Sequence, residues 1–265
     1  MNCTTLIIER REAVAWVWMN RPDVQNAFDE TLIAELTAAF TFLDGQPAVQ
    51  VIVLAGVGKS FSAGADLHWM KRQGAAGLYA NLSDARKLAT LFRVISMCSK
   101  PTLARVHGAA LGGGMGLASA CDICVASTKA QFATSEVRLG LIPAAIGPYV
   151  VRAIGERQAY RYFQTAERIS AERAREMGLA HEIAEPETLD AKVQEVVAAL
   201  LCGGPLSQRA ATELIRAIAH REVDDGVVED TARRIAMLRA TAEAKEGLSA
   251  FLEKRPAAWL ATTEV

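Results

Sequence analysis

The sequence predicts a mixed α/β protein that ends in an all-helical region. Apolar, β-branched runs typical of buried strands lie at residues 49–54, 102–106 and 123–126, with amphipathic helical patterns between and after them. Strands that alternate with helices are typical of α/β architectures. We expect a boundary at the Gly-Gly-Pro sequence near residue 204, with one domain over residues 1–204 and a helical appendage over 205–265.

The N-terminal half supplies the first strands and helices. Residues 5–9 and 14–19 are strand-like runs on either side of a charged corner, which predicts a hairpin. Asp29 is placed to cap a helix that carries an apolar stripe along one side. A second amphipathic pattern predicts a helix at residues 83–97.

The C-terminal half is predicted to be mainly helical. Helical patterns occupy residues 156–164, 170–177, 206–220 and 227–244. Gly178 closes the second of them, because glycine favours the left-handed conformation in which many helices end. No strand pattern separates the last two, so this part of the chain is expected to be built from helices alone.

The composition indicates a well-buried globular chain without a basic field. Hydrophobic residues make up 51% of the 265 residues and the formal net charge is -1, which gives no support for binding nucleic acid or a membrane surface. The five cysteines are an odd number and we expect no secretory leader, so the predicted location is the cytoplasm. Cys121 and Cys124 have CxxC spacing, but no second pair completes a zinc set; we interpret them as structural and expect no metal.

A glycine-rich stretch, HGAALGGGMG at residues 107–116, is the most informative part of the chain. It follows the predicted strand 102–106 and carries five glycines in ten residues. Glycine allows positive φ angles and close approach of a backbone to a ligand. A strand that leads through such a turn into a helix presents free backbone N–H groups to an acceptor. We therefore favour a ligand-binding turn over a turn made only for helix packing.

A second small-residue loop, SAGAD at residues 62–66, also follows a predicted strand. The preceding residues 58–60 (GKS) imitate the end of a phosphate-binding P-loop, but that motif needs a glycine where Val53 stands. We therefore exclude binding of a nucleoside triphosphate. No Ser-His-Asp, HExxH or nucleophile-elbow pattern is visible, so covalent and metal catalysis have little support.

Two backbone-donor loops and an isolated carboxylate remain. Two amide N–H groups that converge on one carbonyl oxygen form an oxyanion hole, which suits chemistry through an enolate. Glu136 and Arg138 are the only charges in residues 131–147. Apolar surroundings raise the pKa of a carboxyl toward values useful for acid/base catalysis. The residues alone leave two interpretations of Glu136 open: a catalytic carboxylate, or a structural glutamate paired with Arg138.

Four segments together resemble the crotonase, or enoyl-CoA hydratase/isomerase, superfamily. They are SAGAD (62–66), KPTLARVHGAALGGG (100–114), CDI (121–123) and EVRLGLIP (136–143), in the family's order and at its spacing. The resemblance covers nearly the whole chain. It implies a crotonase-type spiral of repeated ββα turns and a C-terminal helical region that builds homotrimers, often paired into hexamers. It implies no cofactor beyond the coenzyme A of an acyl-CoA substrate.

The resemblance also implies roles for individual residues. Ala65 and Gly113 match the two backbone donors that hold the thioester carbonyl, and Glu136 matches a catalytic glutamate of the family's hydratases. The positions that line the coenzyme A groove are matched by Asn26, Ala27, Ala63, Asp66 and Leu67. A C-terminal segment that reaches coenzyme A phosphates, on the same or a neighbouring subunit, is matched by Phe251, Lys254 and Arg255.

The sequence departs from the family's usual hydratase pattern at Gly116. Those hydratases carry two catalytic glutamates around one water, and Gly116 stands where the first is expected. A single carboxylate is also what the enoyl-CoA isomerases of the family use. The segments ADLHWMK (65–71), SEVRLGLIPAAIGPYVVRAIG (135–155) and AFLEKRPAAW (250–259) resemble most closely the bacterial methylglutaconyl-CoA hydratases and the related isohexenylglutaconyl-CoA hydratases. Several of those relatives also lack the first glutamate.

These observations lead to one expected function and two alternatives. We expect a cytoplasmic hydratase, a lyase that adds water to a branched 2-enoyl-CoA, above all 3-methylglutaconyl-CoA from leucine or acyclic terpene breakdown. The free carboxylate of such a substrate needs a partner, for which Lys71, Arg72 and Arg138 are unranked candidates. The alternatives are an enoyl-CoA isomerase with Glu136 as its single base, and a non-catalytic member that binds acyl-CoA or a protein.

Overall fold

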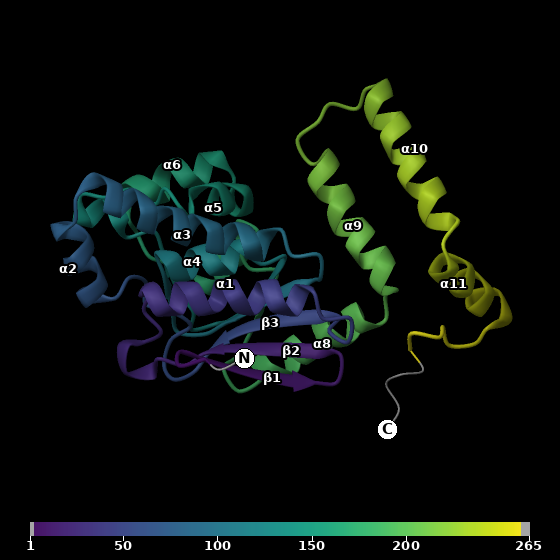
Figure 1. Ribbon diagram of the computed structural model, residues 1–265, viewed down its shortest axis with the longest axis horizontal. Coiled ribbons are helices and arrows are strands. Elements are labelled where there is room, and N and C mark those ends of the chain that lie inside the picture. Colours follow the sequence, from purple (N-terminus) through teal and green to yellow (C-terminus); the bar gives the residue numbers. More distant parts are fainter. Residues whose placement is uncertain (1–2, 261–265) are drawn as a thin grey trace.

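Two sheets form the body of the protein, seen in the computed structural model of Figure 1, which describes residues 3–260. The larger sheet has the strand order β1-β2-β3-β4-β6-β9, and the smaller has the order β5-β7-β8. β1 and β2 form an antiparallel hairpin, as predicted, and each later strand of the larger sheet pairs in parallel. The strands are β1 (Leu6–Arg11), β2 (Val14–Met19), β3 (Val51–Gly56), β4 (Thr102–Val106), β5 (Ala109–Leu111), β6 (Ile123–Ser127), β7 (Gln131–Ala133), β8 (Ile169–Ser170) and β9 (Glu182–Ala184).

Most helices pack around the two sheets, and the last three extend away from them. The body carries η1 (Pro22–Val24), α1 (Glu30–Asp44), α2 (Leu67–Ala75), α3 (Leu78–Ser96), α4 (Gly113–Ala120), η2 (Glu136–Leu139), α5 (Gly147–Ile154), α6 (Glu156–Thr165), α7 (Ala171–Glu176) and α8 (Leu189–Leu201). The last three, α9 (Pro205–Ile218), α10 (Asp225–Arg239) and α11 (Ala242–Glu253), form an arm beside the body (Figure 1). The α/β class and the all-helical C-terminal region are confirmed. The division between residues 204 and 205 into separate domains stays a prediction.

The central strand β3 is buried on both faces. Ile52 and Leu54 pack into the main core with α1, α3 and α4, while Val51 and Val53 pack against α8 on the other face. A strand that is covered on both sides reads as a continuous apolar run instead of an alternating one. This is why residues 49–54 were recognisable as a buried strand from the sequence.

Two predicted helices differ from those observed. Helix α3 begins at Leu78 instead of residue 83. The apolar side chains of its first turn point outward, with Leu78 76% and Tyr79 86% exposed, so this turn lacks the buried stripe from which the helix was predicted. The pattern at 227–244 is two helices. Thr241 interrupts it: its hydroxyl accepts a hydrogen bond from the amide of Ala244 at 3.2 Å and caps the start of α11.

The predicted cap at Asp29 is confirmed, and the two cysteines with CxxC spacing are buried. The carboxylate of Asp29 accepts a hydrogen bond from the amide of Leu32 at 2.8 Å at the start of α1. Cys121 and Cys124 are buried free thiols, and burial raises the pKa of Cys124 to about 12. Within residues 3–260, no group of three or more His, Cys, Asp or Glu side chains is placed to hold a metal ion, and none of the helices has the length and apolarity to cross a membrane.

Candidate active site

The two predicted donor loops lie against each other. The amide of Ser62 donates to the carbonyl oxygen of Ala109 at 2.9 Å, and the amide of Leu111 donates to the carbonyl oxygen of Ser62 at 2.9 Å. This parallel bridge joins the 62–66 loop to β5, whose last residue leads into the glycine turn. Two loops that are distant in sequence are therefore fixed as one unit.

The turn into α4 requires glycine at position 112. Its φ of +48° and ψ of −117° lie in a region that residues with a side chain do not adopt without strain. A Cβ placed there would lie 3.2 Å from Oε1 of Glu136 and 3.9 Å from the Cα of Gly64. Gly112 therefore marks the point at which both loops and the Glu136 carboxylate meet.

The amides of Ala65 and Gly113 are free to donate to a ligand. Neither has an acceptor among the hydrogen bonds of residues 3–260, whereas the adjoining amides of Asp66 and Gly112 donate to Phe28 and Ala133 at 2.9 and 2.8 Å. Gly113 opens α4, and the first amides of a helix lack internal partners and favour negative charge nearby. Two free amides on adjoining loops are the donors that an oxyanion hole requires.

Glu136 has one carboxylate oxygen that lacks a hydrogen-bond partner within the described residues. It begins η2, and its Oε2 atom is buried and accepts no hydrogen bond within the described residues. Burial raises the pKa of this carboxyl, because the charged form loses its hydration. Arg138 is exposed, and no ion pair between the two side chains is found in the described structure. The alternative in which Glu136 is the structural partner of Arg138 is therefore not supported.

Asn26 and its neighbour Gln25 hold the loop at residues 57–63 through hydrogen bonds. Its side-chain oxygen accepts from the amide of Arg21 at 2.8 Å, and its side-chain nitrogen donates to two backbone oxygens of residues 57–60, each at 2.9 Å. The next contact is made by Ala63, whose amide donates to the carbonyl oxygen of Gln25 at 2.9 Å. All polar atoms of the Asn26 side chain are thus used inside the protein, and its carbonyl oxygen accepts from the hydroxyl of Ser62 at 2.8 Å. Asn26 is fully buried, so it holds the loop in shape and presents no polar atom to a ligand.

Asp66 is held in the same network. Its carboxylate caps α2 by accepting hydrogen bonds from the amides of His68 and Trp69 at 2.8 and 3.2 Å, and it pairs with Arg21 at 3.2 Å. Burial opposes ionisation of Asp66, but these donors outweigh it and lower the pKa of its carboxyl. Leu67, which follows, is 79% exposed.

Arg21 is a supporting residue that the sequence did not reveal. Its guanidinium pairs with Asp29 at 2.8 Å as well as with Asp66, and it donates to the carbonyl oxygen of Ala27. It thereby ties the start of α1 to the start of α2. No motif marks it, because its partners are distant in sequence.

The C-terminal residues predicted to reach coenzyme A lie on the arm and not at the Glu136 site. Lys254 ends α11 in the left-handed conformation, with φ +56°, on the arm and away from α4 (Figure 1). Arg255 forms ion pairs with Glu246 and Glu253 at 2.6 and 2.8 Å. The structure does not bring Lys254, Arg255 or Phe251 to the Glu136 site of the same chain.

The three candidate partners of a substrate carboxylate differ in their contacts. Arg72 is bound to Glu30 at 2.7 Å, and both side chains are about half exposed. Lys71 and Arg138 are exposed, and no ion pair involves either of them within residues 3–260. Arg72 is therefore the least available of the three.

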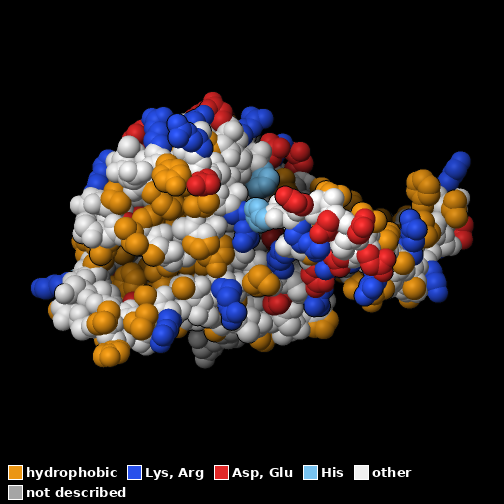
Figure 2. Space-filling view, turned by 90° about the horizontal axis from the view of Figure 1, so that it is seen from above, with side chains coloured by type: hydrophobic (Ala, Val, Ile, Leu, Met, Phe, Trp, Pro, Cys, Tyr) orange, Lys and Arg blue, Asp and Glu red, His pale blue; other side chains and the backbone are white. Residues whose placement is uncertain are grey.

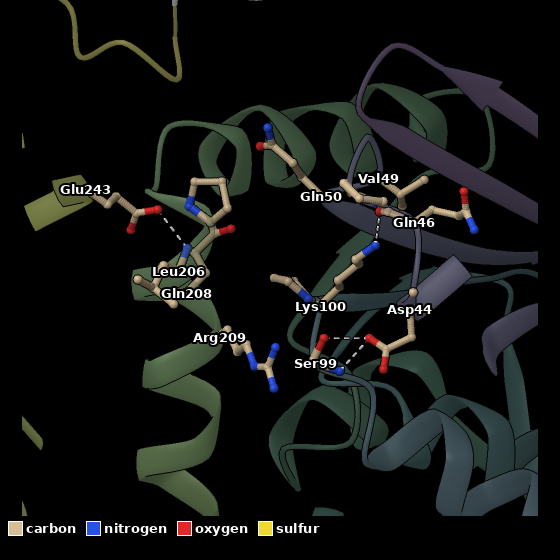
Figure 3. Close-up of a pocket in the computed structure, with 14 residues that line it drawn as sticks. Asp44, Gln46, Val49, Gln50, Ser99, Lys100, Leu206, Gln208, Arg209 and Glu243 are labelled. Atoms are coloured by element: carbon tan, nitrogen blue, oxygen red, sulfur yellow. Dashed lines mark hydrogen bonds between the residues drawn. The ribbon is translucent and has the colours of Figure 1, made fainter. Parts of the chain in front are cut away.

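A cavity of about 380 Å³ lies between the body and the arm, separate from the predicted site (Figure 3). None of the predicted site residues lines it. Its polar groups bind one another: Ser99 donates to Asp44 at 2.6 Å, Lys100 donates to the carbonyl oxygen of Leu43 at 2.6 Å, and Glu243 accepts from the amide of Leu206 at 2.8 Å. We do not assign the site to this cavity.

Comparison with known proteins assigns the chain to a family. Residues 9–262 match the family model for enoyl-CoA hydratase/isomerase. The chain belongs to the enoyl-CoA hydratase/isomerase family. A crotonyl-CoA hydratase of Syntrophomonas wolfei is 34% identical over 263 residues, which cover 97% of this chain and 98% of that protein.

Solved structures agree with this membership of the enoyl-CoA hydratase/isomerase family. An enoyl-CoA hydratase from Shewanella pealeana superposes with a TM-score of 0.94 at 40% identity, covering 97% of this chain and 96% of that one. AtuE of Pseudomonas aeruginosa superposes with a TM-score of 0.92 at 34% identity, covering 97% and 99%. The predicted crotonase fold, with its mixed sheets and C-terminal helices, is confirmed.

Proposed function

We propose that this protein is an enoyl-CoA hydratase in which Glu136 is the one side chain that transfers protons. The supporting observation is the position of its carboxylate, 3.2 Å from where a Cβ of Gly112 would lie, directly before the free amide of Gly113. A proton donor and acceptor beside an oxyanion hole is what addition of water to an α,β-unsaturated thioester needs.

The proposed reaction runs through an enolate. The amides of Ala65 and Gly113 hold the thioester oxygen while the ionised Glu136 takes a proton from water. The water oxygen bonds to C3, the π electrons of the C2–C3 bond move toward the thioester oxygen, and the two amides stabilise the charge by roughly 3–4 kcal/mol each. Protonated Glu136 then gives its proton to C2, which restores the thioester carbonyl and the carboxylate.

Coenzyme A contacts follow from the same arrangement. We assign them to Ala27, Ala63 and Leu67 beside the donor loop, while Asn26 and Asp66, whose side chains are bonded inside the protein, hold that loop in shape. Lys254 lies on the arm, so it would reach coenzyme A phosphates only in the site of a neighbouring subunit. This assignment therefore includes assembly into a homotrimer or a dimer of trimers.

The assignment of Glu136 is tested by Glu136→Gln, which keeps the shape of the side chain and removes the proton transfer. We expect kcat/KM for crotonyl-CoA to fall roughly 10²- to 10⁴-fold. Glu187→Gln, at an exposed position, serves as the matched control and should be unaffected. A Glu136→Gln enzyme with full activity would refute the proposal.

We propose 3-methylglutaconyl-CoA as the substrate and the cytoplasm as the place where the enzyme acts. Lys71 or Arg138 would pair with the free carboxylate of this substrate. Both side chains are exposed and lack an ion pair in the described residues, unlike Arg72. Alanine at the residue responsible should raise KM for 3-methylglutaconyl-CoA far more than KM for crotonyl-CoA. Equal effects on the two substrates would contradict this choice of substrate.

An isomerase that shifts the double bond is the second candidate, and the lack of a second carboxylate at Gly116 favours it. The two activities differ in one respect: only a hydratase incorporates solvent oxygen. Incubation with 2-enoyl and 3-enoyl thioesters in water enriched in heavy oxygen therefore separates them. Label in the product supports the hydratase, and conversion without label supports the isomerase.

A further inference from the structure

The face of α4 at Gly116 is closed by apolar side chains. A Cβ placed on Gly116 would lie 2.2 Å from Cγ2 of Ile146, 2.9 Å from its Cβ and 2.9 Å from Cε1 of Phe92. Ile146 is 2% exposed and Phe92 is fully buried. Position 116 thus lacks the space for any side chain, and not only a carboxylate.

The residues that close this face cannot easily move aside. Ile146 precedes α5 in a helical backbone conformation, and its carbonyl oxygen accepts hydrogen bonds from the amides of Tyr149 and Val150 at 3.0 and 3.1 Å. A β-branched side chain on such a backbone has little freedom at χ1. Phe92 is held between the rings of Phe28 and Tyr149, with ring centroids 6.4 and 5.9 Å away.

This closed face lies next to the proposed base. Gly112, directly before α4, and Gly116 are joined by a hydrogen bond of 3.0 Å across the first turn of the helix. A Cβ on Gly112 would face the Glu136 carboxylate, and a Cβ on Gly116 would face Ile146. The backbone positions that meet the carboxylate and Ile146 are therefore one helical turn apart along the chain.

We infer that Ile146 is the residue that keeps this a one-carboxylate site, by filling the volume that a side chain at position 116 would need. The inference rests on the proposed role of Glu136. It predicts that an acidic side chain at position 116 is accepted only when Ile146 is removed. A carboxylate placed there would then repel the charge of Glu136 and change how the site titrates.

The packing part is tested by thermal unfolding of the full-length protein. Gly116→Ala should lower Tm by roughly 3–10 °C, because the added methyl overpacks the Ile146 contact. In the Ile146→Gly background, Gly116→Ala should lower Tm by less than it does in the wild type, because only the 2.9 Å approach to Phe92 remains. Gly74→Ala is the matched control, since Gly74 also lies in a helix but a Cβ there meets nothing within 4 Å. Additive losses in the double variant, or a Gly116→Ala loss no larger than the control, would overturn the inference.

The chemical part is tested by the pH dependence of kcat/KM for crotonyl-CoA. In Gly116→Glu combined with Ile146→Gly, the acid limb should move to higher pH than in Ile146→Gly alone, because the new carboxylate repels the charge on Glu136. An acid limb at unchanged pH would overturn the inference, as would a Gly116→Glu single variant with wild-type Tm and a shifted acid limb. If Glu136→Gln stays active, the proposed function fails instead. The Tm comparison needs no turnover and still decides whether Ile146 fills the site.

Discussion

Unpaired polar groups set the site apart at the scale of single residues. Oε2 of Glu136 and the amides of Ala65 and Gly113 have no partner in the described structure, while the side chains of Asn26 and Asp66 are fully bonded. Oε2 of Glu136 is a buried atom, and leaving such an atom unpaired costs roughly 1–3 kcal/mol. Its position beside two unpaired amides fits a site that the substrate completes.

The raised pKa of Glu136 predicts how activity depends on pH. Hydration starts with ionised Glu136, so activity is lost as pH falls through the pKa of its carboxyl. Because burial raises that pKa, the acid limb of kcat/KM should lie above the ordinary glutamate value of about 4.3. A limb at or below that value, measured with crotonyl-CoA, would contradict the assignment.

The raised pKa also predicts that the ionised carboxylate of Glu136 destabilises the folded protein. The folded protein binds the Glu136 proton more tightly than the unfolded chain, so the cost of burying the charge is present above the raised pKa. This cost disappears as pH falls below the ordinary value. Glu136→Gln should therefore unfold at a higher Tm than the wild type at pH 7, and the difference should shrink toward pH 4. A Tm difference that does not change with pH would count against this explanation.

At the scale of elements, the arm depends on contacts between its helices. Helix α9 follows Gly204, which supplies no capping side chain. Its first amides, those of Leu206 and Ser207, donate instead to the carboxylate of Glu243 on α11, each at 2.8 Å. A helix start is thus completed by a residue from another helix, a partner that spacing along the chain does not reveal.

This capping contact is open to test by chemical denaturation. Glu243→Ala should lower the free energy of unfolding by about 0.5–2 kcal/mol, the usual cost of losing a helix cap. Glu229→Ala is the control, because Glu229 is 70% exposed and contacts only Arg233 of its own helix within the described residues. A loss no greater than that of the control would show that Glu243 does not stabilise α9.

At the scale of the whole molecule, the arm exposes apolar side chains that one copy of the chain leaves uncovered. Figure 2 shows hydrophobic side chains along the arm as well as on the body. The exposed apolar residues of α9, α10 and α11 are Leu206, Ile215, Val228, Ile235, Met237, Leu248, Phe251 and Leu252. Large exposed apolar patches mark interaction surfaces, which supports the proposed assembly.

We expect Phe251→Glu combined with Leu252→Glu to dissociate the proposed trimer. Their side chains are 80% and 78% exposed in the single chain, and charges there would have to be buried in an interface. Gel filtration with light scattering measures the mass, and Lys245→Glu, an exposed charge change on the same helix, is the control. A wild-type monomer, or a double variant with unchanged mass, would contradict the expectation.

The sequence by itself determined the class of fold and the family, and it predicted the outline of the site. Buried strands, the Asp29 cap and the glycine turn are readable because they follow from local periods, local hydrogen bonds and the conformations open to glycine. The resemblance that identified the family, and with it Glu136, Ala65 and Gly113, also rests on order and spacing along the chain.

Only the tertiary structure decided what surrounds these residues. It separated Glu136 from Arg138, assigned the Asn26 side chain to the loops, connected Arg21 to Asp29 and Asp66, and placed Ile146 in the space beside Gly116. The physical reason is that each depends on contacts between segments far apart in the chain. In the sequence, Gly116 indicates only that a carboxylate is missing. In the folded protein, Ile146 and Phe92 occupy the space that a side chain at this position would need.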